Sequence, residues 1–151
     1  MDVSGEERIS APRDRVWAGL NDADILKHCI PGCQSLEWQS DDELAAVIRV
    51  KIGPLSTSFS GRITLSNVEA PGRYRISASG KGGLAGFAQG YADVVLVEDG
   101  DETILRYSAD AELGGRLAQM GSKLIGSASQ RLATRFFSAF NDAVSERQGE
   151  L

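Results

Sequence analysis

The sequence predicts an α+β fold in which a curved antiparallel sheet of about seven strands wraps around a long C-terminal helix. Between Gln34 and Leu113, apolar residues alternate with polar ones, as they do in strands that bury one face. Between Leu117 and Val144, apolar residues recur every three or four positions, which places them on one face of a helix. A sheet and a helix that are each apolar on one side bury those sides by packing together.

The first part of the chain predicts an edge strand followed by two short helices. Residues 3–9 alternate in character, and this alternation places Glu7 on the same side as its apolar neighbours. Pro12 suits the first turn of a helix, because its fixed φ fits there and its missing N–H is not needed. Asn21-Asp22 is expected to cap the second helix, and Pro31 marks its end.

A meander of further strands accounts for the middle of the chain, with turns such as Asp99-Gly100-Asp101 between them. The expected strands cover residues 34–38, 46–52, 58–65, 73–78, 88–96 and 105–112. The order of one strand, two short helices, a meander and a long helix predicts the helix-grip arrangement, in which the sheet curves around the helix.

Small residues gather in two elements that should pack on each other. The segment Gly80 to Gly90 holds five glycines among eleven residues, and Gly126-Ser127-Ala128-Ser129 lies inside the long helix. Glycine weakens a strand, since it has no side chain to pack and loses much backbone freedom on folding. We therefore expect a hollow domain, and a hollow domain indicates a ligand.

Length and charge exclude several classes of protein. The 151 residues are enough for one domain, covering 1–151, with a core that needs neither disulfide nor metal. A net charge of −5 argues against a nucleic-acid partner, because such proteins need a basic surface for phosphates. No segment resembles a signal peptide or an apolar membrane span. We expect a cytoplasmic protein whose contact with the inner face of the cytoplasmic membrane, where it occurs, is peripheral.

The sequence offers little that resembles a catalytic or metal site. His28, Cys29 and Cys33 are spaced within reach of zinc, but a structural site needs a fourth ligand, and this is the single histidine in the chain. The alternative is two small thiols beside a turn, and we expect both to be free and without metal. No serine or cysteine triad can be assembled, so no catalytic residue, metal ligand or cofactor is predicted. Glu7 is either an inward acid or an exposed edge residue.

Several short segments, taken together and in order, resemble the carbon monoxide dehydrogenase G-subunit family, which belongs to the START-like (Bet v 1-like, polyketide cyclase) superfamily. The segments are Ile9-x-Ala11-Pro12-x-x-x-Val16-Trp17, Asn21-Asp22, Ile30-Pro31-Gly32-Cys33, Ile52-Gly53-Pro54, Phe59-x-Gly61, Gly80-Lys81-Gly82 and Phe136-Phe137. The resemblance implies a hydrophobic cavity between the sheet and the long helix. It also implies association with a molybdenum hydroxylase such as aerobic carbon monoxide dehydrogenase, which the family is thought to recruit to the membrane or supply with quinone.

We therefore expect a non-enzymatic protein that binds an elongated apolar molecule, such as an isoprenoid quinone or a lipid, and serves a molybdenum hydroxylase. Two alternatives stay open: a cyclase- or dehydratase-like enzyme on the same fold, and an interaction protein whose core is filled. The expected ligand-binding residues are Phe59, Gly61, Ala88, Gly90, Ala92, Tyr107, Ala109, Leu117, Leu124 and Ala128.

Overall fold

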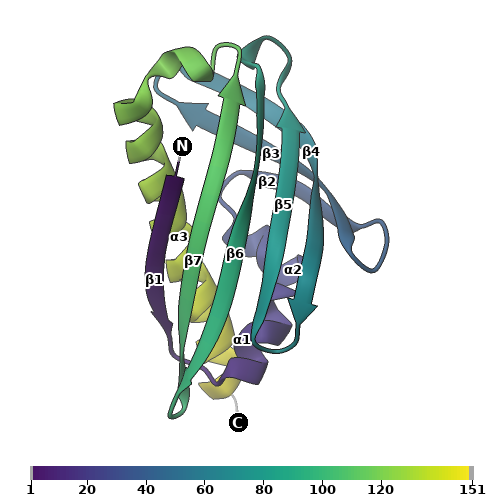
Figure 1. Cartoon of the computed structure of the whole chain (residues 1–151), viewed down its shortest axis with the longest axis vertical. Coiled ribbons are helices and arrows are strands. Elements are labelled where there is room, and N and C mark those ends of the chain that lie inside the picture. Colours follow the sequence, from purple (N-terminus) through teal and green to yellow (C-terminus); the bar gives the residue numbers. More distant parts are fainter. Residues whose placement is uncertain (1, 150–151) are drawn as a thin grey trace.

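The computed structural model, which describes residues 2–149 and their side chains as far as residue 145, contains one seven-stranded antiparallel sheet (Figure 1). Its strand order is β1-β7-β6-β5-β4-β3-β2, so each strand of the meander pairs with its neighbours in the chain. The elements are β1 (Asp2–Ile9), α1 (Arg13–Leu20), α2 (Ala23–Cys29), β2 (Cys33–Trp38), β3 (Glu43–Ile52), β4 (Leu55–Glu69), β5 (Arg73–Lys81), β6 (Phe87–Asp99), β7 (Glu102–Gly114) and α3 (Ser122–Gly149). The predicted fold class is confirmed.

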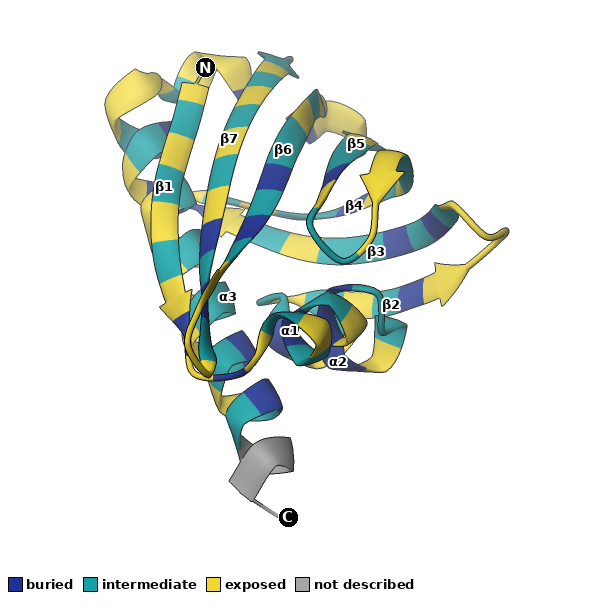
Figure 2. Cartoon of the chain, turned by 60° about the horizontal axis from the view of Figure 1, so that its bottom comes forward, coloured by how far each residue is buried: buried dark blue, intermediate teal, exposed yellow. Residues whose placement is uncertain are grey.

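The long helix α3 runs along the concave side of the sheet, and the two short helices, which come between β1 and β2 in the chain, lie beside its lower part (Figures 1 and 2). The prediction that the helical region starts near Leu117 is wrong in detail. A short 3-10 turn, η2 (Ala118–Met120), comes first, and Gly115 and Gly121 on either side have φ of 68° and 87°. A positive φ interrupts a right-handed helix, so Gly121 separates η2 from α3, which starts at Ser122.

Residues 2–149 contain no helix that is both long and apolar enough to cross a membrane.

The expected cap of the second short helix is present. The carboxylate of Asp22 accepts hydrogen bonds from the backbone N–H groups of Asp24 at 3.0 Å and Ile25 at 3.2 Å. These groups have no partner within the helix, so the cap satisfies donors that would otherwise be lost. In α1, Trp17 meets the ring of Tyr74 edge to face at 5.0 Å, which fixes the short helix on the lower part of the sheet.

The core forms three clusters: a small one of Leu36, Leu44 and Ala46 on β2 and β3, and two larger ones at the two ends of the sheet. At the lower end, α1, α2 and the second half of α3 pack on β1, β5, β6 and β7, around Phe140 and Val144. At the upper end, the β5–β6 connection and the start of α3 pack on β3, β4 and β7. The buried residues of this upper cluster are Ile52, Phe59, Ala85, Leu117, Ile125 and Ala128. The two clusters share none of these residues, and the middle of the concave face lies between them.

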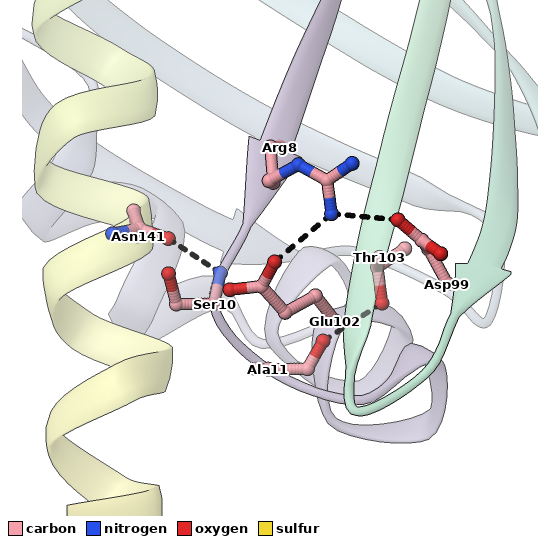
Figure 3. A network of polar contacts seen from close by, with 7 residues as sticks. All are labelled: Arg8, Ser10, Ala11, Asp99, Glu102, Thr103 and Asn141. Carbon is pink, nitrogen blue, oxygen red and sulfur yellow. Dashed lines mark hydrogen bonds and ion pairs between the residues drawn. The ribbon is translucent and has the colours of Figure 1, made fainter.

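A network of polar contacts ties three distant segments together at the lower end (Figure 3). The guanidinium of Arg8 reaches Asp99 at 2.8 Å and Glu102 at 2.9 Å, which joins β1 to the β6–β7 turn. Beneath it, the hydroxyl of the fully buried Thr103 donates a 2.8 Å hydrogen bond to the carbonyl oxygen of Ala11. The backbone N–H of Ser10 donates to Asn141 Oδ1 at 2.7 Å, which adds α3.

The buried bond of Thr103 predicts a measurable loss of stability. Replacing Thr103 by the isosteric valine leaves the carbonyl of Ala11 buried without a donor, and such a group costs about 1–3 kcal/mol. Urea unfolding should show this loss for Thr103→Val, while Thr103→Ser keeps the donor and should lose less. Wild-type stability in Thr103→Val would show that the hydroxyl contributes nothing.

Candidate functional site

The middle of the concave face is made of small residues that the strand register places side by side. One row crosses the sheet through Ala46, Gly61, Gly80 and Ala88, which pair in sequence from β3 to β6. The next row consists of Ala78, Gly90 and Ala111. These side chains are too short to reach α3, so the register itself creates a void between the two core clusters.

Three glycines lie in these rows. Gly61 and Gly90 are required because the backbone of a neighbouring strand comes too close for a side chain, whereas Gly80 leaves space. A Cβ at Gly61 would collide with the carbonyl oxygen of Ser79, and one at Gly90 with that of Asp110. Such close approach is what a sharply bent sheet produces, and no other residue fits it. A Cβ at Gly80 would lie 3.7 Å from its nearest neighbour, which is ordinary contact, so this glycine keeps space open rather than relieving a clash.

The void consists of two adjoining chambers. The inner chamber, about 320 Å³, lies on the rows of small residues. The outer chamber, about 690 Å³, lies between the sheet and α3. Both share the walls formed by Ile48, Phe59, Gly80 and Ala88, and the inner one is lined almost wholly by apolar atoms. Volumes of about 300–1,000 Å³ with apolar walls are typical of small-molecule sites.

The outer chamber reaches the surface through a slot between α3 and the edge of β3. Pairing with β2 ends at Ile48, so residues 49–52 of β3 have no strand beside them on this side. Across the slot, α3 presents Leu132, which is 42 % exposed, together with Arg131 and Arg135. The segment 30–32 closes one end of the slot.

The structure brings most of the sequence-predicted site residues to this cavity. The residues in its wall are Phe59, Gly61, Ala88, Gly90, Ala92, Ala109, Leu117 and Ala128. Tyr107 and Leu124 lie outside the wall. Tyr107 stacks on Phe137 with ring centroids 5.5 Å apart, and Leu124 packs into the upper core cluster beside Gly53. Inward alternation identified the face correctly, but it could not show where along that face the core ends and the cavity begins.

Several further residues of the wall were not predicted from the sequence. Ala46, Ala78 and Gly80 follow the same alternation as their predicted neighbours, so that signal was available for them. The segment 30–32 and the exposed Leu132 carry no such signal, because a loop and the margin of a helix face enter the wall only through the tertiary fold.

Two groups with acid–base chemistry face inward beside the cavity. Glu7 is half-buried and pairs with Leu105 across β1 and β7, so its expected inward orientation is confirmed. Burial and the negative charge of Glu7 together raise the pKa of Tyr107 above its ordinary value. Glycine at position 5 provides the space for the Tyr107 ring, since a Cβ there would lie 2.6 Å from its hydroxyl.

The thiols lie apart from the cavity, in two different settings. Cys29 is buried at 2 % exposure, whereas Cys33 is half-buried with its Sγ 3.4 Å from the carbonyl oxygen of Ser35. Burial raises the pKa of both thiols, for Cys33 against the opposing charge of Lys27. No group of three or more His, Cys, Asp or Glu within residues 2–149 is arranged to hold a metal ion.

A second depression lies on the outer face of the sheet. It measures about 580 Å³ and is lined by polar side chains, including Arg62 and Arg75. Arg75 forms a bidentate pair with Asp93 at 2.8 and 2.9 Å and stacks on the ring of Tyr91 at 4.2 Å, so its charge is already paired with a carboxylate. The concave cavity is therefore the better candidate for an apolar ligand.

A sheet curved around a long helix with an apolar cavity between them defines a START-like protein. The fold matches a START superfamily protein from Mycobacterium smegmatis (14% identity, 96% of this chain and 97% of that chain, TM-score 0.70). It also matches the Zhui aromatase/cyclase from Streptomyces sp. R1128 (16% identity, 97% and 94%, TM-score 0.69). At these identities the likeness shows the fold alone. A conserved protein from Geobacillus kaustophilus is more similar (26% identity, 97% and 96%, TM-score 0.91).

Residues 5–145 match the carbon monoxide dehydrogenase G-subunit (CoxG) family, and the chain belongs to that family. None of the curated proteins matches the chain. Family and fold together support a ligand-binding or accessory role.

The open space at Gly80 predicts that a larger side chain is tolerated there. In Gly80→Val, the new side chain projects into the void, and valine favours a strand over glycine, so we expect stability to rise by up to about 1 kcal/mol. Urea unfolding measures it, with Ser77→Val on the outer face of the same strand as the matched control. Overpacking would instead lower the stability by about 1–3 kcal/mol and would show that the space is filled.

The different burial of the two thiols predicts different reactivity. Because the thiolate is the reactive species and burial raises both pKa values, each should react with iodoacetamide more slowly than free cysteine at neutral pH. Cys33, which is more exposed, should be alkylated before Cys29, and unfolding in urea should equalise the rates. Mass spectrometry of the digested protein reports each site, and fast labelling of native Cys29 would contradict the buried setting.

Proposed function

We propose that this protein binds an elongated apolar molecule in the concave cavity and serves, without catalysis of its own, as an accessory factor to a molybdenum hydroxylase. The cavity carries this proposal, because a continuous apolar void between two well-packed clusters costs stability unless something fills it. The proposed contacts are the eight sequence-predicted residues in the wall, with Tyr107 and Leu124 supporting the wall from outside.

An isoprenoid quinone or a lipid is our candidate ligand, and an enzyme of the aerobic carbon monoxide dehydrogenase kind is our candidate partner. Family membership supports the partner. The apolar inner chamber and the open slot support a long, flexible molecule, because such a ligand can extend from one chamber through the other. We also propose that the chain acts in the cytoplasm, with peripheral contact to the membrane. Residues 1–151 then form one domain, since α3 packs on strands from both halves of the chain.

Native mass spectrometry of freshly purified protein, followed by lipid extraction, tests for a bound molecule. We expect an adduct that disappears on extraction. In a second measurement, decylubiquinone is titrated into emptied protein. Gly80→Val should weaken its binding at least about tenfold by occupying the cavity, while Ser77→Val should leave it unchanged. Equal affinity in the two variants would place the ligand elsewhere.

The enzyme alternative has one observation in its favour. Glu7 and Tyr107 face inward together, and the raised pKa of Tyr107 keeps it protonated as a hydrogen-bond donor. The Zhui aromatase/cyclase shows that the fold accommodates chemistry in another protein. A turnover that is lost in both Glu7→Gln and Tyr107→Phe, with ligand affinity retained, would favour this alternative. The filled-core alternative is disfavoured by the two chambers.

A further inference from the structure

We infer that the upper end of the molecule is a docking surface for an anionic lipid bilayer. The surface, called here the cationic end, consists of Lys51, Lys81, Arg116, Lys123 and the exposed Leu84. The inference rests on the proposed function, because it names the place from which the apolar ligand enters the protein. It adds the surface that makes the contact and the charge of the lipid that is selected.

The segments that carry these residues are distant in the chain, but the ends of β5 and β7 lie at the end of the molecule where α3 begins (Figure 1). Lys81 ends β5 and pairs with Phe87, which in turn pairs with Gly114 at the end of β7. The backbone N–H of Leu117, next to Arg116, donates a 2.9 Å hydrogen bond to the carbonyl oxygen of Ala85, next to Leu84.

The remaining contacts to this end come from the β3–β4 hairpin. A Cβ on Gly53 would lie 3.2 Å from Leu124, so the hairpin that carries Lys51 meets the first turn of α3 that carries Lys123. All four cations therefore surround the upper core cluster.

Acidic residues are sparse toward this end, where Glu112 on β7 accepts a 2.8 Å hydrogen bond from Gln89. The chain has a net charge of −5, yet it contains no acidic residue from 44 to 68, from 70 to 92 or from 113 to 141. These three segments supply the whole cationic end. At the opposite end, the β6–β7 turn is acidic, with Asp99, Asp101 and Glu102. Among the described residues, none of the four cations forms an ion pair.

The first turn of α3 shows that this charge has a local cost. The N-terminus of a helix carries a partial positive charge, so acidic residues are favourable there and cations are not. The first turn of α3 has no acidic residue and instead contains Lys123. The position is thus occupied by a residue that helix stability alone does not favour.

An apolar side chain stands among these cations. Leu84 lies in the 3-10 turn η1 (Gly83–Ala85) and is 87 % exposed, and Phe87 just after it is 42 % exposed. Gly83 and Gly86, with φ of 59° and 105°, give the turn a shape that directs Leu84 away from the protein. Apolar side chains surrounded by Lys and Arg are the pattern by which peripheral proteins enter the interface of an anionic membrane.

A bilayer fits this surface better than an acidic protein does. Energetically dominant contacts between proteins are enriched in Trp and Tyr, while Leu is under-represented. The cationic end has neither Trp nor Tyr, and its most exposed apolar residue is a leucine. In addition, the cavity reaches this end through Leu117 and Lys51, and a water-insoluble ligand resides in a bilayer before it is bound.

Vesicle co-sedimentation tests the proposal with the full chain. Wild-type protein should bind vesicles of phosphatidylcholine mixed with phosphatidylglycerol more tightly than vesicles of phosphatidylcholine alone, and added salt should weaken the binding. The double variant Lys81→Glu/Lys123→Glu should bind at least about tenfold more weakly, at roughly fivefold per cation. Leu84→Ser should also weaken binding, without any change in charge.

The matched control is Arg73→Glu/Arg106→Glu, which makes the same change in net charge at exposed positions away from the cationic end. It should bind vesicles nearly as wild type does. Decylubiquinone titration without vesicles should be unchanged in Lys81→Glu/Lys123→Glu, because neither residue lines the cavity. This readout separates failure of the docking surface from failure of the proposed function.

Three results would overturn the inference. They are equal binding to neutral and anionic vesicles, equal weakening in the control variant, and a wild type that binds no vesicles but retains an acidic protein through Lys81 and Lys123.

Discussion

The cross-strand register of the central sheet is the constraint on which the rest of the structure depends. It aligns small residues from β3, β4, β5 and β6 in adjacent rows, so no side chain from the sheet reaches α3 there. A shift of one residue in any of these strands would turn its small residues to the outer face and its polar residues into the core. Gly61 and Gly90 also permit the close backbone contacts that bend the sheet. The same small residues therefore allow both the curvature of the sheet and the cavity.

The packed core and the cavity are thereby assigned to different parts of the same elements. The second half of α3 is held by Phe140 and Val144, which are 0 % and 1 % exposed, and by the polar network around Thr103. The first half of α3 covers the cavity with Ala128 and the exposed Leu132.

The order of elements and the inward face of each strand could be predicted from the sequence, because alternation and helical periodicity are local signals. The concentration of glycine indicated a void, but only Gly80 leaves space, whereas Gly83 and Gly86 shape a turn and Gly90 permits a backbone contact. The sequence could not predict that Tyr107 and Leu124 lie outside the cavity wall. Their positions depend on contacts with Phe137 and Gly53, which are distant in the chain. The 3-10 turn before α3 was missed because apolar spacing continues through it, and only the positive φ at Gly121 interrupts the helix.

The free edge of β3 has a consequence for the solubility of the protein. The N–H of Arg49 donates to the carbonyl oxygen of Gly32 at 2.8 Å, but residues 50–52 have no strand beside them, and such an edge can pair with another chain. A slot for a ligand requires this gap, since a longer β2 would close it. Arg49 and Lys51 occupy the exposed positions of the edge, where like charges on two approaching copies repel. The mouth of the cavity can therefore stay open while the strand edge remains unfavourable for edge-to-edge aggregation.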